Sequence, residues 1–333
     1  MTKLLIYIPI YNAENRIRRT LEYLTAALKT FSSEFVRVHI VDNASTDNTA
    51  RIVQEFVDLS NGQISLEVNK ENVGGMLNIF NGLIVDVGQQ FTWMIGDDDF
   101  VSPWSLETLF SFLDELDSKS IKVKFIHVNT LIVSNEIYHN PQVFNLVKEK
   151  KASGWLMNQK FTSPTITQFK QLVDPRVDGS ILGFIGGCIF DSKSVRDTAE
   201  RVGYNHVPNS EYLYNSFNCE DWYPHVHIFS KTFLADDLCL ANPTVSIITT
   251  IQHQLYLAHR APIFGCGSLD SLFELLDNGV INLDEFESYV RTFFVAQKHL
   301  IAYIIKNRIE LYSERKREVL LKTYAWFVEN HLK

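Results

Sequence analysis

The chain has 333 residues, of which 46% are hydrophobic and 21% are charged, and its formal net charge is −8. This size and composition are typical of a globular protein with one large domain, or with one domain and an appendage. The acidic balance argues against a broad nucleic-acid footprint, which needs a basic face.

The cysteines and the apolar runs indicate where the protein works. Cys188, Cys219, Cys239 and Cys266 are scattered and form no Cys-x-x-Cys pair. This spacing favours reduced thiols over a zinc site or a disulfide framework. The N-terminal residues lack the pattern of a signal peptide, and no apolar run in the sequence is long enough to span a bilayer. We therefore expect a cytoplasmic protein, with contact to the inner face of the plasma membrane as an alternative.

The first 130 residues or so alternate between strand-like and helix-like segments. Continuous apolar runs predict strands at residues 4–10, 36–41, 64–68, 91–95 and 124–128. Helical spacing of apolar residues predicts helices at 14–29, 46–59, 75–87 and 106–116. Asn12 is expected to cap the first helix, and Ser102 and Pro103 resemble the start of the fourth. The alternation predicts an α/β fold with a doubly wound, mostly parallel sheet flanked by helices.

The remaining sequence is less regular and then becomes helical. A late strand is predicted at 233–240, after a turn-like Gly-rich stretch at 183–187, and Asp236-Asp237 is interpreted as an ordinary turn. From residue 246 onward an apolar helix and a basic-studded helix are expected. We predict one domain over residues 1–245, with halves 1–130 and 131–245, and a helical region over 246–333. We interpret the basic cluster at 315–317 as a solvated face and the apolar stripe of these helices as a packing surface. A dimer interface or a membrane-surface contact is the alternative.

Polar, turn-forming residues follow each of the first four strands. They are Pro9, Tyr11, Asn12 and Glu14 after the first, Asp42, Asn43, Ser45 and Asp47 after the second, Asn72, Gly74 and Gly75 after the third, and Asp97, Asp98 and Asp99 after the fourth. In a parallel sheet these strand ends meet at one edge, where ligands bind. A tyrosine ring can stack on a base, a carboxylate can accept a base N–H, and a Gly-Gly turn lets backbone donors approach a phosphate. Individually, each cluster is also an ordinary turn or helix cap.

The acidic triplet at 97–99 is the most demanding of these clusters. Two carboxylates about 6 Å apart repel by roughly 0.7 kcal/mol in water and about 3 kcal/mol near a partly buried surface. A Mn²⁺ or Mg²⁺ ion that holds a nucleotide phosphate would offset this repulsion, because such ions prefer oxygen ligands. The alternative is an acidic loop that only caps the next helix. Two other nucleotide sites fail, since the sequence has no Gly-x-Gly-x-x-Gly after the first strand and no Walker A loop.

The set of motifs resembles family 2 glycosyltransferases of the GT-A fold. It comprises Pro9-x-Tyr11-Asn12-x-Glu14, Val41-Asp42-Asn43-x-Ser45-x-Asp47, Asn69-x-x-Asn72-x-Gly74-Gly75 and Asp97-Asp98-Asp99-x-x-x-Pro103. The resemblance covers residues 1–115 or so and is specific as a set. It implies a metal-dependent, inverting transfer of a sugar from a UDP- or dTDP-sugar to a saccharide or lipid-linked glycan acceptor, in the synthesis of a surface polysaccharide.

The resemblance also implies roles for single residues. Tyr11 and Asp42 would contact the base, Glu14 and Asn72 would lie near the nucleotide, and the acidic triplet would hold the metal and the donor diphosphate. The other expected donor-binding residues are Pro9, Asn12, Asn43, Ser45, Gly74, Gly75 and Asn78. The family often writes the acidic motif as Asp-x-Asp-Asp, and alignment on Pro103 puts Gly96 at the first Asp. Asp98 and Asp99 are therefore the expected metal ligands, ahead of Asp97, and Asp97 and Asp98 are also expected to contact the donor. The helix after the Gly-Gly turn lacks the arginine that the family often has there.

The second half of the chain should supply the catalytic base and the acceptor site. Inverting transfer needs a group that takes the proton of the acceptor hydroxyl. Glu220-Asp221 resembles the family's Glu-Asp pair, which implies Asp221 as the base and Glu220 as a neighbour that raises its pKa or binds the acceptor. Trp222 offers a face for sugar stacking, and the small residues Gly186 and Gly187 would leave room for a sugar. A helix N-terminus that merely prefers acidic residues is the alternative.

Several histidines and two other functions are left open. His225 and His227 cannot face the same way on a helix, so a joint metal site is not expected. Each is interpreted as a structural residue, with contact of one of them to the diphosphate or the metal as the alternative. His253, His259 and Arg260 are candidates for phosphate contact. A sugar-phosphate nucleotidyltransferase is the first alternative function, although its Gly-rich, basic loop after the first strand is missing. A non-catalytic nucleotide-sugar-binding protein is the second, against which the acidic triplet and the Glu-Asp pair argue.

Overall fold

The structure, a computed structural model, describes residues 2–157, 159–173, 182, 184–204, 223–250, 268–296, 302, 305–306 and 309–331. Its strands are β1 Thr2–Ile10, β2 Val36–Asp42, β3 Ile64–Val68, β4 Gln89–Met94, β5 Phe100–Val101, β6 Phe125–Val133, β7 Gly154–Leu156, β8 Thr165–Gln168, β9 Cys188–Asp191 and β10 Leu238–Thr249. Its α-helices are α1 Ile17–Leu28, α2 Thr49–Leu59, α3 Gly75–Ile84, α4 Ser105–Ser118, α5 Asn135–Tyr138, α6 Val143–Lys148, α7 Phe169–Leu172, α8 Ser192–Val202, α11 Pro224–Thr232, α12 Ser268–Asp277, α13 Leu283–Ala296 and α15 Glu314–His331. Short 3₁₀ turns lie at Ile185–Gly187 and Ile309–Leu311.

One sheet runs through the molecule in the order β3-β2-β1-β4-β9-β6-β10-β5, with β7 beside β6 and β8 beside β10. The predicted alternating α/β fold is confirmed, and β3, β2, β1 and β4 are all parallel. The strand predicted at 124–128 is β6, but it is not the neighbour of β4. The later strand β9 lies between them, antiparallel to both. The second half of the sheet is therefore mixed, which the local pattern of apolar residues could not show.

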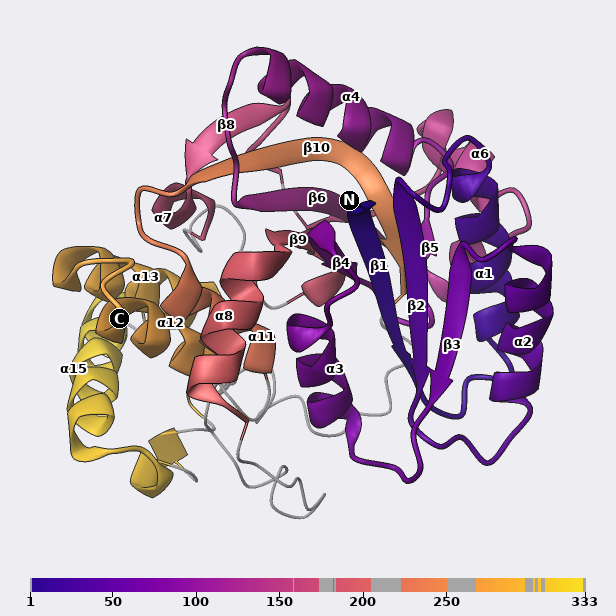
Figure 1. Ribbon diagram of the computed structural model, residues 1–333. Helices are drawn as coiled ribbons and strands as arrows, with labels where there is room; N and C mark the ends of the chain where they lie inside the picture. The colour runs from indigo at the N-terminus through magenta and orange to yellow at the C-terminus, as the bar shows by residue number, and fades with distance from the viewer. Residues whose placement is uncertain are drawn as a thin grey trace.

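Alternation of side chains along the strands gives the sheet two apolar faces. Figure 1 shows helices on both sides of the sheet. Leu4, Ile6 and Ile8 of β1 belong to a core that is shared with α1, α2 and α4. Tyr7 points to the other face, whose core is shared with α3, α8, α11 and the C-terminal helices. The result is a three-layer arrangement in which the strand ends remain at one edge of the sheet.

Some predicted element boundaries are wrong, and contacts from other parts of the chain explain why. α1 begins at Ile17, not at residue 14, and Asn12 has a left-handed backbone with a φ of 46°. α4 begins at Ser105, because the hydroxyl of Ser102 bonds to the carbonyl of Val245 in β10 at 2.8 Å rather than capping the helix. The strand predicted at 233–240 is β10, which begins five residues later and extends to Thr249. Asp236 does lie in a turn, as expected.

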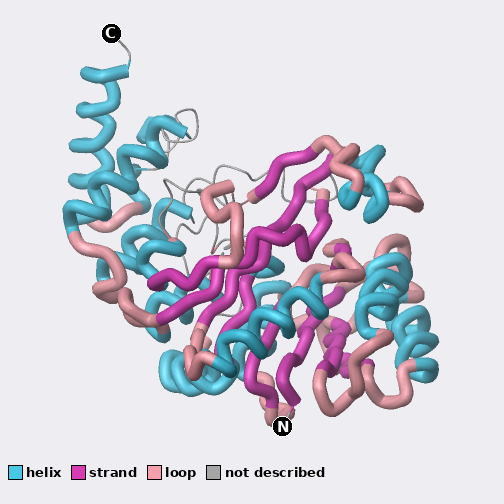
Figure 2. Tube along the Cα trace, turned by 90° about the horizontal axis from the view of Figure 1, so that it is seen from above, coloured by secondary structure: helices cyan, strands magenta, loops and turns pink. Residues whose placement is uncertain are grey.

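The expected boundaries at residues 130 and 245 both fall inside strands, β6 and β10. The sheet therefore continues through each of them. Beyond β10, α12 packs on α11, α13 packs on α12, and α15 packs on α13. Their buried residues, such as Leu269, Phe273, Phe286 and Leu320, belong to the same core as α11. Figure 2 shows α15 at one end of the molecule.

Two further observations concern the whole described part of the chain. None of its helices combines the length and the apolar character that a membrane crossing requires. Cys188 and Cys239 are buried and unpaired, in agreement with the expected reduced thiols, and burial raises the pKa of both. Cys219 and Cys266 lie outside the described residues.

Candidate active site

The register of the sheet brings the four polar loops to one edge. Ile10 is paired with Asp42, and Asp42 is paired with Val68, so β1, β2 and β3 end side by side. The amide of Ile95 donates to the carbonyl of Tyr7 at 3.1 Å, which continues the β1–β4 pairing toward the acidic loop. The residues that follow these strands therefore share one site, as the parallel pattern predicts.

The first two loops are fastened to each other by side chains. The Oδ1 atom of Asn12 accepts a hydrogen bond from the amide of Thr46 at 2.9 Å, and the Asn12 amide donates to the Oγ atom of Ser45 at 2.9 Å. The carboxylate of Glu14 accepts from the amide of Asn48 at 3.0 Å, at the start of α2. Asn12 and Glu14 thus hold the second loop, whereas the ring of Tyr11 is 41% exposed and available for stacking.

Asp42 is the most deeply buried of the residues at the second strand end. Its Oδ1 atom accepts hydrogen bonds from the amide and the hydroxyl of Ser45. Its Oδ2 atom is buried and has no hydrogen-bond partner in the part of the chain that the structure describes. An unpaired buried acceptor is costly, so this atom marks the place where a ligand N–H would be stabilised.

The third loop is braced by amide side chains. Asn43 donates to the Oδ1 atom of Asn72 at 2.8 Å and accepts from the amide of Val73 at 2.9 Å. Gly74 has a φ of 88°, which favours glycine, and it leads into α3. On α3, Asn78 donates to the carbonyl of Val41 at 3.2 Å. These hydrogen bonds of Asn43, Asn72 and Asn78 position the loops around the site. Pro9 lies within β1, opposite Val41. A Cβ on Gly75 would meet no atom within 4 Å.

The acidic loop is held from three sides. The guanidinium of Arg16 binds both carboxylate oxygens of Asp97, at 3.0 and 2.7 Å. The hydroxyl of Thr20 donates to the carbonyl of Asp97 at 2.7 Å, and the hydroxyl of Tyr138 donates to the carbonyl of Asp98 at 2.6 Å. The Oδ2 atom of Asp99 accepts from the amide of Gly96 at 2.8 Å. The backbone of the loop is consequently fixed before any ligand is bound.

The three carboxylates differ in how their charge is balanced. Burial raises the pKa of Asp97, against which Arg16 acts. Burial, followed by the charges of Asp99 and Asp97, raises the pKa of Asp98 to about 8, and burial raises that of Asp99 to about 6. No ion pair or hydrogen bond reaches the carboxylate of Asp98 from a described side chain. When both are ionised, Asp98 and Asp99 therefore have no ion-pair partner among the described side chains.

This chemistry fits a divalent cation. Two neighbouring carboxylates without a countercharge are suitable ligands for Mn²⁺ or Mg²⁺. Among the described residues no group of three His, Cys, Asp or Glu side chains could hold a metal ion. A cation on Asp98 and Asp99 would therefore complete its coordination with oxygens of a ligand or of water, as Mg²⁺ does at many phosphate sites.

Of the two glycines expected at the acceptor side, Gly186 lies against this loop and Gly187 lies against β6. The Trp93 Nε1 atom donates to the carbonyl of Gly186 at 2.7 Å. A Cβ at position 186 would lie 3.1 Å from the Oδ2 atom of Asp99 and 2.7 Å from the ring of Phe184. A side chain at Gly186 would thus clash with the Phe184 ring and press on Asp99, which is a reason for glycine that does not depend on an acceptor. A Cβ at Gly187 would lie 3.3 Å from the imidazole of His127.

The expected catalytic residues lie outside the described residues. This holds for Glu220, Asp221 and Trp222, and for the phosphate-contact candidates His253, His259 and Arg260. The other two histidines take part in packing. His225 is buried, with its Nε2 atom 2.9 Å from the carbonyl of Leu182, and the Nδ1 atom of His227 lies 3.0 Å from the carboxylate of Glu274.

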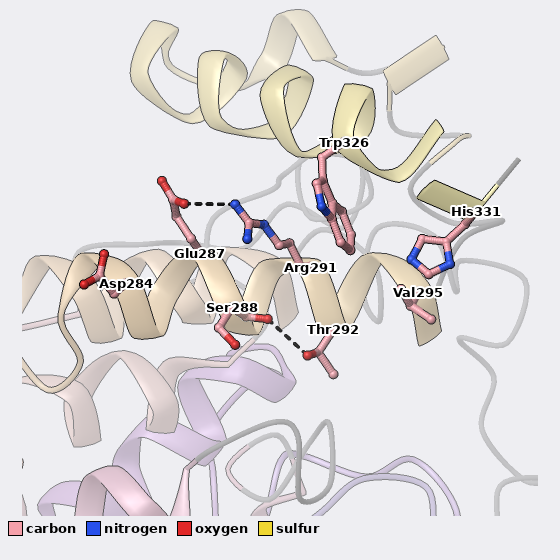
Figure 3. A pocket seen from close by; sticks show the side chains of 8 residues that line it. All are labelled: Asp284, Glu287, Ser288, Arg291, Thr292, Val295, Trp326 and His331. Carbon is pink, nitrogen blue, oxygen red and sulfur yellow. Dashed lines mark hydrogen bonds and ion pairs between the residues drawn. The ribbon is translucent and has the colours of Figure 1, made fainter. Parts of the chain in front are cut away.

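A pocket of about 490 Å³ lies elsewhere, between α13 and α15 (Figure 3). Its lining is Asp284, Glu287, Ser288, Arg291, Thr292, Val295, Trp326 and His331. Arg291 lies over the ring of Trp326 at 5.2 Å and pairs with Glu287 at 3.2 Å. None of the residues expected to bind the donor lines this pocket. Its side-chain contacts join the two helices, which is the role that the structure supports for it.

Sequence reasoning missed three residues that organise the acidic loop: Arg16, Thr20 and Tyr138. Arg16 follows Asn12 by one helical turn, and its Nη1 atom donates to the carbonyl of Asn12 at 3.1 Å. This spacing could have indicated that Arg16 returns to the first loop. Tyr138 is forty positions from Asp98 in sequence, and no local signal could have identified it.

The sequence and the fold are similar to those of known proteins. The family model described as "Glycosyl transferase family 2" matches residues 5–174, which is half of the chain. Among curated proteins, the poly(ribitol-phosphate) beta-N-acetylglucosaminyltransferase TarS of Staphylococcus aureus, from two strains, is 29% identical over 130 residues. The match covers 39% of this chain and 22% of TarS, so the matching segment spans about a fifth of the length of these relatives.

Solved structures show the same fold. A fragment of S. aureus TarS in complex with UDP matches with a TM-score of 0.53 and 16% identity, over 99% of this chain and 89% of that one. The corresponding UDP-GlcNAc complex matches with a TM-score of 0.54 and 14% identity, over the same shares. The mannosyltransferase PcManGT of Pyrobaculum calidifontis, in complex with GDP-Man and Mn²⁺, matches with a TM-score of 0.51 and 13% identity, over 99% of this chain and 81% of that one. The expected GT-A-type architecture is thereby confirmed.

Proposed function

The chain belongs to glycosyl transferase family 2, and from this premise we propose that it moves a sugar from a UDP-sugar to a saccharide or lipid-linked glycan acceptor with inversion. The observation that carries the proposal is the convergence of an exposed Tyr11, an unpaired Oδ2 atom on buried Asp42, and the uncompensated pair Asp98–Asp99 at one sheet edge. Tyr11 and Asp42 suit a base, and the carboxylate pair suits the cation that a bound diphosphate needs.

The donor would lie across the strand ends. Tyr11 would stack on the uracil ring, and the Oδ2 atom of Asp42 would accept the hydrogen bond of its ring N–H. The backbone of the Gly74–Gly75 turn would face the ribose or the diphosphate. UDP is the favoured nucleotide, because the similar TarS structures contain UDP and UDP-GlcNAc. A dTDP-sugar offers the same base edge and stays an alternative.

Asp98 and Asp99 would hold the cation, with Mn²⁺ or Mg²⁺ as candidates. When bound, such an ion neutralises charge that develops on the leaving diphosphate. The protein contributes a prearranged loop: Arg16, Thr20 and Tyr138 fix the position of the backbone. The Mn²⁺ complex of the similar PcManGT supports the choice of a divalent cation.

Asp221 would act as the general base. It would take the proton of the acceptor hydroxyl while that oxygen bonds to the anomeric carbon, and the bond from this carbon to the diphosphate oxygen would break on the opposite face. Glu220 would keep the pKa of Asp221 raised, and Trp222 would stack on the acceptor sugar. Gly186 adjoins the acidic loop, and Gly187 follows it beside His127, so the acceptor would approach from their side.

The name of one relative supports a class of acceptor. TarS acts on poly(ribitol-phosphate), as its name says, and we propose a surface glycan or a related polymer as the acceptor of this chain. The reaction would take place in the cytoplasm, either free or at the inner face of the membrane. Self-association through the C-terminal helices belongs to the same proposal.

A donor screen tests the function. We expect UDP-sugars to raise the melting temperature of the protein in the presence of Mn²⁺, because a ligand that binds only the folded state stabilises it. At a ligand concentration of a hundred times Kd, the stabilisation is about 2.7 kcal/mol. Hydrolysis or transfer with release of UDP identifies a glycosyltransferase, whereas release of pyrophosphate would identify a nucleotidyltransferase. No shift with any nucleotide sugar would contradict the proposal.

Substitution of Asp221 by Asn tests the proposed base. We expect transfer to fall by about 10²–10⁴-fold, the range of general base catalysis, while UDP affinity and melting temperature are retained. Steady-state transfer and calorimetric titration with UDP measure the two properties. Unchanged turnover of Asp221→Asn would reject Asp221 as the base. Glu220→Gln serves as the matched control, and we expect it to lose less transfer activity than Asp221→Asn.

A further inference from the structure

The acidic loop carries one carboxylate more than a pair of metal ligands needs, and Arg16 holds it. The guanidinium binds Asp97 through two hydrogen bonds, Nε to Oδ1 at 3.0 Å and Nη2 to Oδ2 at 2.7 Å. The Asp97 side chain is only 14% exposed. This is a two-bond, charge-assisted pair in a largely desolvated place, the form in which such pairs are strongest.

We propose that Arg16 is a positioning residue that keeps Asp97 out of the cation site and so reserves Asp98 and Asp99 for the cation. Three carboxylates and one guanidinium leave a formal charge of −2 (−3 + 1) on this group of residues. That charge matches one divalent cation. The charge of Asp97 acts on both Asp98 and Asp99, and the charge of Arg16 acts on Asp98. The pairing therefore sets the field in which the cation binds.

Arg16 also joins the acidic loop to the turn that follows β1. Its Nη1 atom donates to the carbonyl of Asn12 at 3.1 Å, and its Nη2 atom donates to that of Tyr11 at 3.3 Å. One side chain thereby fixes the separation between the turn that presents the Tyr11 ring and the loop that presents Asp98. This inference rests on the proposed function, which assigns the base and the diphosphate of one donor to these two places.

A cycle of variants tests the role of Arg16 in cation binding. Asp97→Asn leaves the Arg16 charge unpaired beside Asp98, and we expect the affinity for Mn²⁺ alone to fall by about tenfold. Arg16→Met/Asp97→Asn removes both charges, and its affinity should return to within about threefold of the unaltered protein. Asp98→Asn should lose the cation in either background. Calorimetric titration with Mn²⁺, without nucleotide, measures all of these. Equal losses in Asp97→Asn and in the double variant would show Asp97 to be a metal ligand and would overturn the proposal.

A conservative substitution separates charge from geometry. Arg16→Lys keeps the positive charge but cannot form the two-bond fork or reach both carbonyls. We expect it to retain Mn²⁺ affinity and to bind UDP about three- to tenfold more weakly at saturating Mn²⁺, with a raised KM for the donor and a smaller change in kcat. Unchanged UDP affinity in both Arg16→Lys and the double variant would overturn the link between the two loops.

The melting temperatures of the same variants give a readout that is independent of ligands. Arg16→Met and Asp97→Asn should each destabilise the protein, because each leaves a buried charge unpaired, and the double variant should lose less than their sum. Additive losses would overturn the pairing. If the unaltered protein binds no Mn²⁺, both the reserved cation site and the proposed cofactor are overturned. The proposed function is then tested separately by UDP binding and sugar transfer.

Discussion

At the scale of single residues, the strand ends combine two kinds of polar side chain. One kind forms hydrogen bonds within and between the loops: the side chains of Asn12, Asn43 and Asn72. Asp42 and Asp98 keep buried or half-buried oxygens that no described side chain satisfies. Sequence reasoning placed all five in one site, because turn residues follow each strand. It did not separate the two groups, since the distinction depends on which partner each oxygen meets across the sheet edge.

Asp42 offers a direct test of this separation. In Asp42→Asn, one of the two side-chain positions becomes an N–H₂ donor and faces either the Ser45 amide or the base N–H. We expect UDP to bind about 10- to 100-fold more weakly, since a hydrogen bond to a charged group contributes roughly 1.5–3 kcal/mol. Calorimetric titration measures it. Ser45→Ala, which leaves the Oδ2 atom in place, is the matched control and should lose clearly less affinity. Equal affinities of Asp42→Asn and the unaltered protein would remove Asp42 from the donor site.

At the scale of elements, close packing of α3 on β1 positions the third loop. A Cβ at Gly82 of α3 would lie 2.6 Å from the ring of Tyr7 and 2.8 Å from the Met94 methyl group. The Tyr7 hydroxyl donates to the carbonyl of Asn78 at 2.9 Å, and burial raises the pKa of this tyrosine. The apolar spacing predicted this helix over residues 75–87, whereas it ends at Ile84. Its distance from the sheet depends on the absence of a single methyl group.

Gly82→Ala should therefore destabilise the protein. Alanine is the better helix former by about 1 kcal/mol, but overpacking of a filled interface costs about 1–3 kcal/mol, and the contacts of 2.6–2.8 Å make the second effect the larger. Urea unfolding measures the change. Gly75→Ala at the start of the same helix is the matched control, because a Cβ there would meet no atom within 4 Å. A loss of stability in the control but not at Gly82 would refute this account of the packing.

A second feature at this scale is the bulge of β10 between Asn242 and Ile247. It interrupts the pairing with β6, and side chains from the start of α4 bond to the local carbonyls. Ser102 and Trp104 both donate to the carbonyl of Val245, at 2.8 and 3.0 Å, and Ser105 donates to that of Ser246 at 2.8 Å. These contacts anchor the segment directly after the acidic loop. The serine that resembles a helix cap in the sequence serves a strand instead.

At the scale of the whole molecule, charged residues connect the C-terminal helices to the sheet domain. Glu274 of α12 lies 3.0 Å from His227 and 3.8 Å from Lys231, both of α11. Burial would raise the pKa of Glu274, but the hydrogen bond of His227 and the charges of His227, Lys231 and Lys316 of α15 lower it overall. The ion pairs of Glu274 thereby join α12 to α11.

The lowered pKa of Glu274 predicts a pH dependence of stability. A carboxyl whose folded-state pKa lies below its unfolded value stabilises the protein above the unfolded value, here 4.5, and this contribution is lost as the pH falls through the folded-state pKa. We expect the melting temperature to fall less between pH 7 and pH 4 in Glu274→Gln than in the unaltered protein. A difference of about 2–4 °C corresponds to roughly 1 kcal/mol in a large domain. Parallel curves for the two proteins would exclude this contribution.

The sequence by itself determined the α/β class, the first four strands with the helices between them, and the gathering of polar residues at the strand ends. Each of these follows from local periodicity and from the rule that parallel strands end together. Only the tertiary structure decided that β9 separates β4 from β6, that Arg16 neutralises Asp97, and that Tyr138 and β10 fix the acidic loop. These three features depend on contacts between residues that are far apart in the chain. The energies of such contacts come from burial and charge in the folded state. They therefore produce no periodic pattern of residues in the sequence.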